Sequence, residues 1–201
     1  MRIFGIACAL LIGAQSAIAD DFSGGYAGGG IAIGTSADRV FPTDDSSHMD
    51  SPSGIAFGGL NFSYGDFVFG PELSLRANLS PQTISESQST SGAIHWRSTY
   101  QETFAPTLSF RAGAKVDRFL LYGRAGLGTS RIKWVGEEKT PFYEERETDH
   151  LSGIALSGAL GAEYNLDRFF VRLEGEVRRL QLDGDTNITE YQANTAIGVR
   201  F

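Results

Sequence analysis

Long apolar runs are nearly absent from this chain: after residue 20, no stretch is long and apolar enough to form a membrane helix. The three histidines, His48, His95 and His150, show no short metal-ligand spacing. An excess of positive charge is also missing, because the formal charge is −7 at pH 7. These absences exclude a helical membrane protein, argue against nucleic acid as a partner, and lead us to predict no cofactor and no bound metal.

The one apolar stretch lies at the N-terminus and predicts an export signal. Met1-Arg2 is a short basic start, residues 3–13 are apolar, and Ala17-Ile18-Ala19 has the small-x-small pattern of a cleavage site. We therefore expect residues 1–19 to be a Sec signal peptide that is cleaved after Ala19. The only cysteine, Cys8, would leave with it, so the mature chain would have no thiol, as suits an oxidising compartment. Residues 20–201 are expected to form one domain.

Alternation of apolar and polar residues is what the chain does have. In the last eleven residues, every second side chain is apolar, aromatic or β-branched, and the residues between them are small, polar or charged. The apolar face consists of Tyr191, Ala193, Thr195, Ile197, Val199 and Phe201. A strand that ends on an aromatic residue is typical of the closing strand of a transmembrane β-barrel, whose outer face meets lipid and whose lumen is polar.

The same pattern predicts eight strands joined by alternating short and long connections. The predicted strands are 25–34, 55–64, 67–78, 103–115, 119–133, 151–164, 169–180 and 191–201. Short turns are expected around residues 65–66, 117–118 and 166–168, and longer loops at 35–53, 79–102, 134–150 and 183–189. Aromatic residues cluster beside the short turns, namely Tyr64, Phe67, Phe119, Tyr164, Phe169 and Phe201. This asymmetry predicts an all-β, eight-stranded antiparallel up-and-down transmembrane β-barrel with periplasmic turns and extracellular loops.

Several segments resemble one known family. They are the Gly-rich opening Gly24–Gly30, the segments Phe110–Gly128 and Leu160–Glu176, and the ending Ile197-Gly-Val-Arg-Phe201. Together they are similar to the small eight-stranded outer-membrane β-barrels of opacity-type and outer-membrane-protein-A-like surface proteins, especially the alphaproteobacterial surface-antigen branch. The chain departs from that branch at Val177-Arg178-Arg179, where a Tyr-Arg-Tyr-like stretch is expected. The resemblance implies the bacterial outer membrane, no catalytic residues, and Phe201 as the signal read by the barrel-assembly machinery.

Charged residues gather on the predicted lumen face. They are Glu72, Arg76, Arg111, Lys115, Arg124, Glu163, Arg172, Glu174, Glu176, Arg178 and Arg200. These side chains could line a charged pore, or pair with one another and plug the barrel. We favour the plug, because an eight-stranded barrel is only wide enough for side chains to fill and buried charges must be paired. A soluble lipocalin-like barrel would instead put its apolar face inward, where these strands carry Arg and Glu.

Two loop features complete the candidate sites. The predicted loop 134–150 is acidic and could bind a divalent cation or a partner, although a solvated loop explains it more simply. His150 and Ser152, with Glu147 or Asp149, are the only candidates for a lipid-modifying barrel enzyme, and nearness in sequence does not give triad geometry.

We therefore expect a non-enzymatic outer-membrane protein that supports the envelope and displays loops for surface interaction. Its expected partners are outer-membrane lipid and lipopolysaccharide, the assembly machinery, and an extracellular partner at the loops. A small channel for ions or solutes is the alternative, and a lipid-modifying enzyme is a remote one.

Overall fold

The computed structural model describes residues 22–36, 52–88, 95–182 and 187–201. The predicted signal peptide with Cys8, the cleavage site after Ala19, most of the first predicted loop, and His48 lie outside these residues. None of the described segments forms a helix long and apolar enough to cross a membrane.

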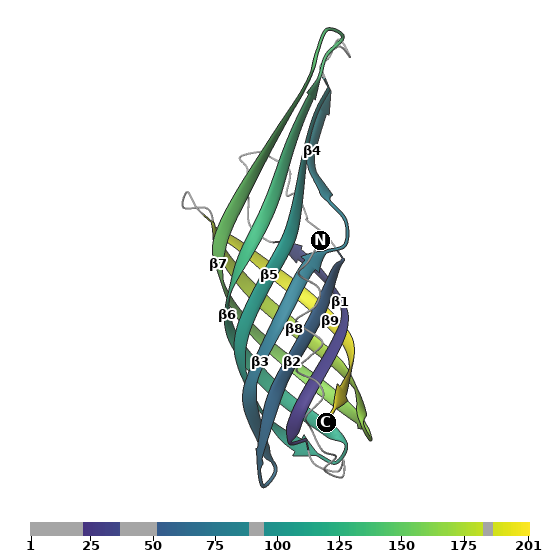
Figure 1. The fold of residues 1–201 in the computed structure, drawn as a ribbon, viewed down its shortest axis with the longest axis vertical. Helices are drawn as coiled ribbons and strands as arrows, with labels where there is room; N and C mark the ends of the chain where they lie inside the picture. Colours follow the sequence, from purple (N-terminus) through teal and green to yellow (C-terminus); the bar gives the residue numbers. More distant parts are fainter. Residues whose placement is uncertain (1–21, 37–51, 89–94, 183–186) are drawn as a thin grey trace, which may run out of the picture.

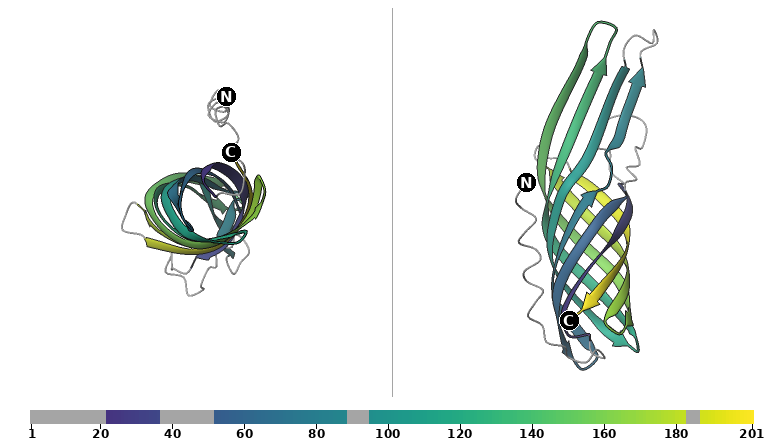
Figure 2. Two further views of the ribbon diagram at one scale, coloured as in Figure 1. Left: turned by 90° about the horizontal axis from the view of Figure 1, so that it is seen from below. Right: turned by 45° about the vertical axis from the view of Figure 1, so that its right-hand side comes forward.

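Strands make up nearly all of the described chain. They are β1 (Gly24–Ser36), β2 (Ser53–Tyr64), β3 (Phe67–Asn78), β4 (Gln82–Gln88), β5 (His95–Val116), β6 (Phe119–Lys139), β7 (Glu144–Leu166), β8 (Phe169–Leu182) and β9 (Asn187–Arg200). All pairs are antiparallel, and eight strands follow one another around the ring as β3-β2-β1-β9-β8-β7-β6-β5. Pairing of β3 with β5 closes the ring (Figures 1 and 2), which confirms the predicted eight-stranded barrel. The short strand β4 pairs only with β5 and lies outside the ring.

Three two-residue turns gather at one end of the barrel, which we call the turn end; the opposite end is the loop end (Figure 1). The first residue of each turn, Gly65, Asp117 or Asp167, has a positive φ of 59°, 51° or 59°. Left-handed residues in such tight hairpins match the twist of the flanking strands, and Asp tolerates this conformation better than most residues. The start of β1 and the end of the chain also meet at this end, because Gly25 and Phe201 exchange two backbone hydrogen bonds of 2.9 Å.

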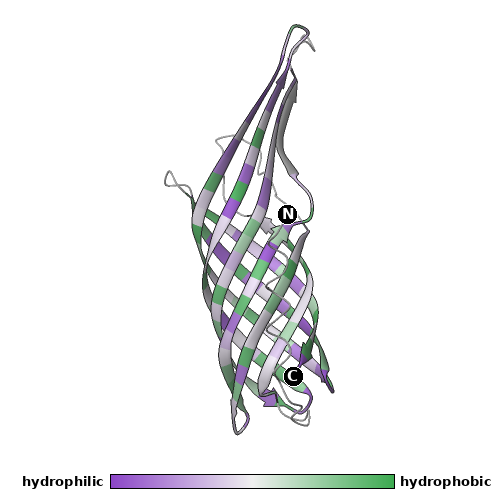
Figure 3. Cartoon of the chain, viewed as in Figure 1, coloured by the Kyte–Doolittle hydropathy of each residue, from purple (hydrophilic) through white to green (hydrophobic). Residues whose placement is uncertain are grey.

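Apolar side chains cover the outside of the barrel. Along β8, exposed and buried residues alternate without exception, with Val171, Leu173 and Val177 on the outside. The other strands expose Ile31, Leu60, Phe62, Leu73, Leu108, Phe110, Leu121, Leu127, Ile154, Leu156, Leu160 and Ile197 in the same way. Figure 3 shows apolar and polar positions interspersed along the strands of the barrel. The outward faces predicted from the sequence are therefore correct, and the barrel presents to its surroundings the apolar surface that a lipid environment requires.

The lumen contains apolar side chains as well as charges. Phe22, Val68, Leu120 and Tyr122 form one cluster, and Tyr26, Phe57, Phe170 and Ala196 form a second. A third cluster consists of Tyr100, Ile132, Ala155, Leu180, Leu182 and Ile188. The first contains Leu120 next to the β5–β6 turn and lies at the turn end. The third contains Leu182 at the end of β8 and Ile188 at the start of β9 and lies at the loop end. Apolar packing therefore flanks the charges along the axis.

The predicted loops 79–102 and 134–150 are wrong over most of their described parts; only residues 79–81 and 140–143 among them lie outside strands. Strand pairing between β5 and β6 continues up to His95↔Lys139, and pairing between β6 and β7 continues up to Lys139↔Glu144. With β4, these extensions form a sheet that stands beyond the barrel rim (Figures 1 and 2). We call residues 82–88, 95–102, 132–139 and 144–151 the projecting sheet. Its polarity suggested loops because a sheet in water has no need of an apolar face, whereas the barrel wall does.

Candidate functional site in the charged lumen

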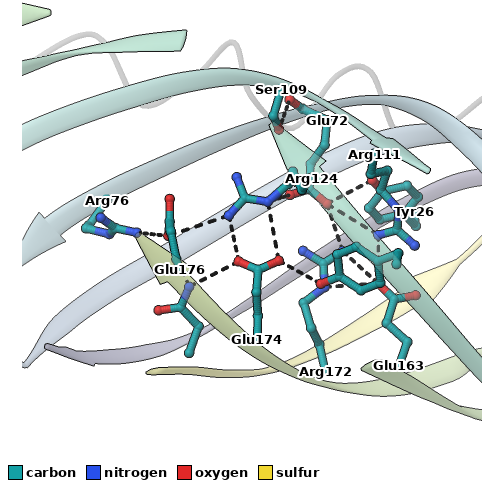
Figure 4. A network of polar contacts seen from close by, with 12 residues as sticks. Tyr26, Glu72, Arg76, Ser109, Arg111, Arg124, Glu163, Arg172, Glu174 and Glu176 are labelled. Atoms are coloured by element: carbon teal, nitrogen blue, oxygen red, sulfur yellow. Dashed lines mark hydrogen bonds and ion pairs between the residues drawn. The ribbon is translucent and has the colours of Figure 1, made fainter. Parts of the chain in front are cut away.

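The charged lumen is built by alternation along the strands. On β8, residues Arg172, Glu174, Glu176 and Arg178 are two apart and therefore all point inward. Strands β3, β5, β6 and β7 add charged side chains that pair with these or with one another (Figure 4), and β9 adds Arg200. The short, two-residue connections at the turn end fix the registers of the hairpins and so fix which charges meet.

Glu163 is the centre of the network near the turn end, and only 1% of its side chain is exposed. Its Oε1 lies 2.7 Å from guanidinium nitrogens of both Arg111 and Arg172, and Arg200 pairs with its Oε2 at 2.5 Å. Arg172 also reaches Glu72 at 2.8 Å. One carboxylate thus joins charges from β5, β8 and β9 through charge-assisted hydrogen bonds.

Glu174 is the centre of the next layer. Arg124 binds it with two nitrogens, Nη2 at 2.6 Å from Oε1 and Nε at 3.3 Å from Oε2. The hydroxyl of Tyr122 donates to the same carboxylate at 2.7 Å, and Asn194 donates to both Glu174 and Glu176 at 3.1 and 3.2 Å. This carboxylate therefore has a partner for each oxygen, as a buried charge requires.

The layer nearest the loop end contains two acids that the sequence analysis did not assign to the lumen. Arg178 Nη1 lies 2.8 Å from Glu102 Oε1 and 3.1 Å from Glu190 Oε2, and Ser130 donates a further hydrogen bond to Glu102. Glu102 had been placed in a loop, and Glu190 before the last strand. A β-bulge near residue 103 shifts the alternation of β5, so even-numbered residues point inward above it. A bulge leaves little signal in the sequence, which is why Glu102 was missed.

Aromatic rings separate and cover the guanidinium groups. Arg172 lies over the ring of Phe57 with 3.8 Å between Cζ and the ring centroid, and Arg111 lies between Tyr26 and Tyr122 at 4.7 and 4.5 Å. Tyr26 also donates a 2.8 Å hydrogen bond to Glu72. Cation–π contacts in a desolvated site stabilise charges that have lost their water. Only the charged residues of the inward face were predicted as lumen site residues, so these aromatics were not among them.

The network is electrically balanced. Six carboxylates (Glu72, Glu102, Glu163, Glu174, Glu176 and Glu190) face six guanidinium groups (Arg76, Arg111, Arg124, Arg172, Arg178 and Arg200). These twelve described residues carry no net charge as a set, and Lys115 lies on the same face of β5 nearer the turn end.

Little space remains between these side chains. A cavity of about 20 Å³ lies among residues that include Arg76, Arg124, Arg178 and Asn194. Each of these four has one polar atom without a hydrogen-bond partner among the described protein residues. Such a volume holds about one water molecule. The lumen charges and the aromatic side chains beside them are buried, so side chains fill the lumen at their level, and the small hollow there is lined by both apolar and charged residues.

The structure brings together ten of the eleven charges assigned to the lumen. Nine of them are buried: Glu72, Arg111, Arg124, Glu163, Arg172, Glu174, Glu176, Arg178 and Arg200. The tenth, Arg76, has a side chain that is 10% exposed and pairs with Glu176. The eleventh, Lys115, follows Arg111 on the same face of β5 at the turn end and is half-buried.

The acidic stretch 134–150 forms the end of β6, the start of β7 and the tip of the hairpin between them. Residues 141–150 are all exposed, and Phe142 at the tip is 95% exposed. Two ion pairs cross this hairpin, Lys139–Glu144 at 3.9 Å and Arg146–Glu137 at 3.5 Å. A hydrogen bond to Glu138 raises the pKa of the Tyr143 phenol. In the described ranges, no three His, Asp, Glu or Cys side chains are arranged to hold a metal.

The residues considered for a lipid-modifying enzyme are not brought together. They lie on one continuous strand, so His150 and Ser152 point to one face of the sheet, and Glu147 and Asp149 point to the other. No carboxylate of this set can therefore orient the imidazole of His150 towards Ser152, which a triad would require.

Known proteins resemble this chain over most of its length. Ail, the attachment invasion locus protein of Yersinia pestis, matches with a TM-score of 0.51 and 16% identity over 89% of this chain and 99% of that one. Neisserial surface protein A matches with a TM-score of 0.54 and 10% identity over 89% and 98%. The outer membrane protease OmpT of Escherichia coli gives 0.49 and 11% over 93% and 99%. At these identities the likeness to Ail and to Neisserial surface protein A shows the fold alone.

A comparison with curated proteins gives no match. A sequence model of the outer membrane protein beta-barrel domain, in contrast, matches residues 4–201. This match agrees with the closed ring of antiparallel strands and with its apolar outer wall. The chain therefore belongs to the outer membrane protein β-barrel domain family, and its location is the bacterial outer membrane.

Proposed function

We propose that this protein is a structural and surface-interaction barrel: it supports the envelope and carries the projecting sheet on the cell surface. In this proposal, the turn end faces the periplasm and the loop end faces outward. Surrounding lipid and lipopolysaccharide are its partners at the wall, and an extracellular molecule is its partner at the sheet. The barrel-assembly machinery is its partner during biogenesis, through Phe201.

The observation that carries the proposal is the packed and balanced lumen. Buried ion pairs hold six strands together, because the network joins residues of β3, β5, β6, β7, β8 and β9. A side chain that pairs across the lumen cannot also be hydrated by a continuous column of water. Ion pairs across the lumen thus stabilise the barrel wall, which supports a mechanical and display role more than transport.

A channel remains the second candidate, and one observation favours it. The cavity of about 20 Å³ has both apolar and charged side chains in its lining, and three of its lining residues, Arg76, Arg124 and Arg178, each have a buried N–H group without a protein partner among the described residues. Hydration of these groups would be the first step towards a water-filled path. Conductance of the refolded protein separates the two candidates.

The surface role can be tested with a shortened hairpin. Ile132 and Leu151 are register partners near the rim, so residues 133–150 can be replaced by Asn-Gly, which favours a two-residue hairpin turn. In a strain that lacks the protein, the full chain should restore both resistance to bile salts or detergents and attachment of cells to protein-coated surfaces. The short-hairpin variant should restore resistance alone.

The controls are outer-membrane level and the mobility shift on unboiled gels, which must match for the two proteins. Restoration of attachment by the short-hairpin variant would contradict the display role. Restoration of small-solute uptake, with no effect on resistance or attachment, would favour the channel.

A further inference from the structure

Strand β7 forms one of the two edges of the projecting sheet, opposite the edge formed by β4, and the β7 edge is open. The pairing of β7 with β8 begins at Gly153↔Leu182, whereas the pairing of β7 with β6 runs on to Glu144. Residues 144–152 of β7 therefore have a strand on one side only, among the parts of the chain that the structure describes. An unpaired strand edge is a template for the addition of a further strand.

The phase of the hydrogen bonds shows which backbone groups face this open edge. At the tip, Thr140 N donates to Tyr143 O at 2.9 Å, and at the turn end Asn165 N donates to Arg118 O at 2.8 Å. The register between them has no shift, so both ends give the same alternation. Odd-numbered residues of β7 bond to β6. The N–H and C=O groups of even-numbered residues, such as Arg146 and Thr148, therefore point to the open edge.

The side chains beside this edge differ between the two faces of the sheet. Glu145, Glu147 and Asp149 point to the face that continues the lumen, which we call the inner face. Register places Glu138, Trp134 and Trp96 on the same face, and none of the described side chains there is basic. The outer face is mixed, with Glu144, Arg146 and His150 on β7.

The inner face carries two like charges that have no cationic partner among the described residues, although the Tyr143 hydroxyl donates a 2.9 Å hydrogen bond to Glu138. Glu138 and Glu145 are directly opposite each other across the hairpin. Like charges in such a pair destabilise a sheet, and a cation placed between them removes the cost. Near the tip, Arg146 and Lys139 form their ion pairs with Glu137 and Glu144 on the outer face, and Lys133 also lies on that face, opposite His150.

We propose that the edge of β7 from Glu144 to Ser152 binds an extended, basic segment of an extracellular protein as an additional strand. The backbone of the segment bonds the even-numbered residues of β7, and its Lys or Arg side chains at alternate positions face Glu145, Glu147 and Asp149. Carboxylates two residues apart in a strand repeat every ~6.8 Å, the same spacing as alternate residues of the incoming chain. This inference rests on the proposed surface role and names its partner.

The test uses the refolded mature protein in lipid nanodiscs and a fluorescent peptide in which Lys alternates with Thr or Val. Fluorescence anisotropy measures its affinity. The charge variant is Glu147→Gln with Asp149→Asn on the inner face, and the matched control is Glu137→Gln with Glu144→Gln on the outer face. Both remove two negative charges. We expect the inner-face double variant to weaken peptide binding about tenfold and the outer-face double variant to change it by less than about twofold. Charged side chains on neighbouring strands interact only when they lie on the same face of the sheet.

The edge variant is Thr148→Pro, which removes an N–H that points away from β6 and leaves the hairpin bonds in place. We expect this variant to weaken peptide binding about tenfold. It removes the hydrogen bond that the N–H of residue 148 would donate to the peptide and disturbs the adjacent bonds along the edge. Its mobility shift on unboiled gels must equal that of the parent. A peptide of the same composition with its lysines clustered should bind less well than the alternating one.

Equal loss of binding in the two charge variants would overturn the inner-face assignment, and unchanged binding in Thr148→Pro would overturn strand addition. Absence of peptide binding, with attachment still lost in the short-hairpin variant, would overturn this inference alone. Steady conductance of the barrel would instead overturn the proposed function, whatever the peptide does.

Discussion

Single buried charges in this lumen have several partners each, so no side chain acts alone. Glu163 accepts from Arg111, Arg172 and Arg200, and removal of any one of these leaves the others with less compensation. In a low-dielectric interior the loss of a partner costs more than the formation of the pair gains. Breaking an ion pair in the lumen should therefore reduce the free energy of unfolding much more than breaking an ion pair on the surface.

Glu174→Ala tests this difference. The variant leaves Arg124 without its bidentate partner and Tyr122 without its acceptor, so the free energy of unfolding should fall by ~3–5 kcal/mol. The matched control is Glu144→Ala, whose ion pair with Lys139 is about two-thirds exposed and 3.9 Å long; it should change stability by less than ~1 kcal/mol. Urea unfolding in lipid vesicles measures both. Similar values for the two variants would mean that the lumen is hydrated.

Leu160→Arg tests the outer wall. Leu160 is 76% exposed on β7, with Gly123 and Gly175 opposite it, so its side chain contacts lipid rather than protein. A charge near the membrane mid-plane should cost ~2–4 kcal/mol in the free energy of folding into vesicles. Leu160→Ala at the same site should cost less, because no charge enters lipid. If the two substitutions are tolerated equally, the faces of β7 have been assigned wrongly.

At the scale of elements, the barrel strands and the projecting strands obey different rules. Outward apolar residues on β8 and β9 could be read from the sequence because lipid imposes a strict period of two. The upper halves of β5, β6 and β7 could not, because water accepts polar residues on both faces and the pattern then resembles a loop. The bulge near residue 103 could not be predicted either, because no residue there signals it, and it is the bulge that makes Glu102 point into the lumen. Turn positions were predictable, since Gly65, Asp117 and Asp167 suit positive φ.

Substitution of Phe201 tests whether this residue matters for the stability of the barrel or for its assembly in cells. Its backbone exchanges two hydrogen bonds with Gly25, and its ring is 38% exposed. Phe201→Ala keeps the backbone bonds and removes only a ring whose burial is worth at most ~1.5–3 kcal/mol. Refolding in detergent should therefore remain nearly complete, while the outer-membrane level in cells falls sharply. Unchanged levels in cells would remove the assembly-signal role of this residue.

At the scale of the whole molecule, one end is compact and the other extends outward. Short turns and the closing Gly25–Phe201 pair lie at one end, and the projecting sheet lies at the other (Figure 1). The barrel, its strand order and ten lumen charges could be predicted because closure and lipid leave few alternatives. The partners of each charge could not, since they depend on registers between strands that are far apart in sequence, such as Arg76 with Glu176.

Protease accessibility on intact cells tests the orientation. Trypsin or Glu-specific protease should cleave within the exposed tip, residues 140–147, and should spare the turns at Asp66, Asp117 and Asp167. After the cells are broken, the turns should become accessible, although tight two-residue hairpins are cut slowly. Cleavage at the turns in intact cells, with the tip protected, would invert the barrel.

The central claim is that the lumen is closed by its own ion pairs. The most direct measurement is the conductance of the refolded mature protein in a planar lipid bilayer, with Glu174→Ala beside it. We predict no steady conductance for the parent, and for the variant at most small, irregular openings together with reduced stability, because its unpaired Arg124 is left buried. A steady, well-defined conductance of the parent, whose cation preference falls in Glu174→Ala while stability is unchanged, would contradict the account.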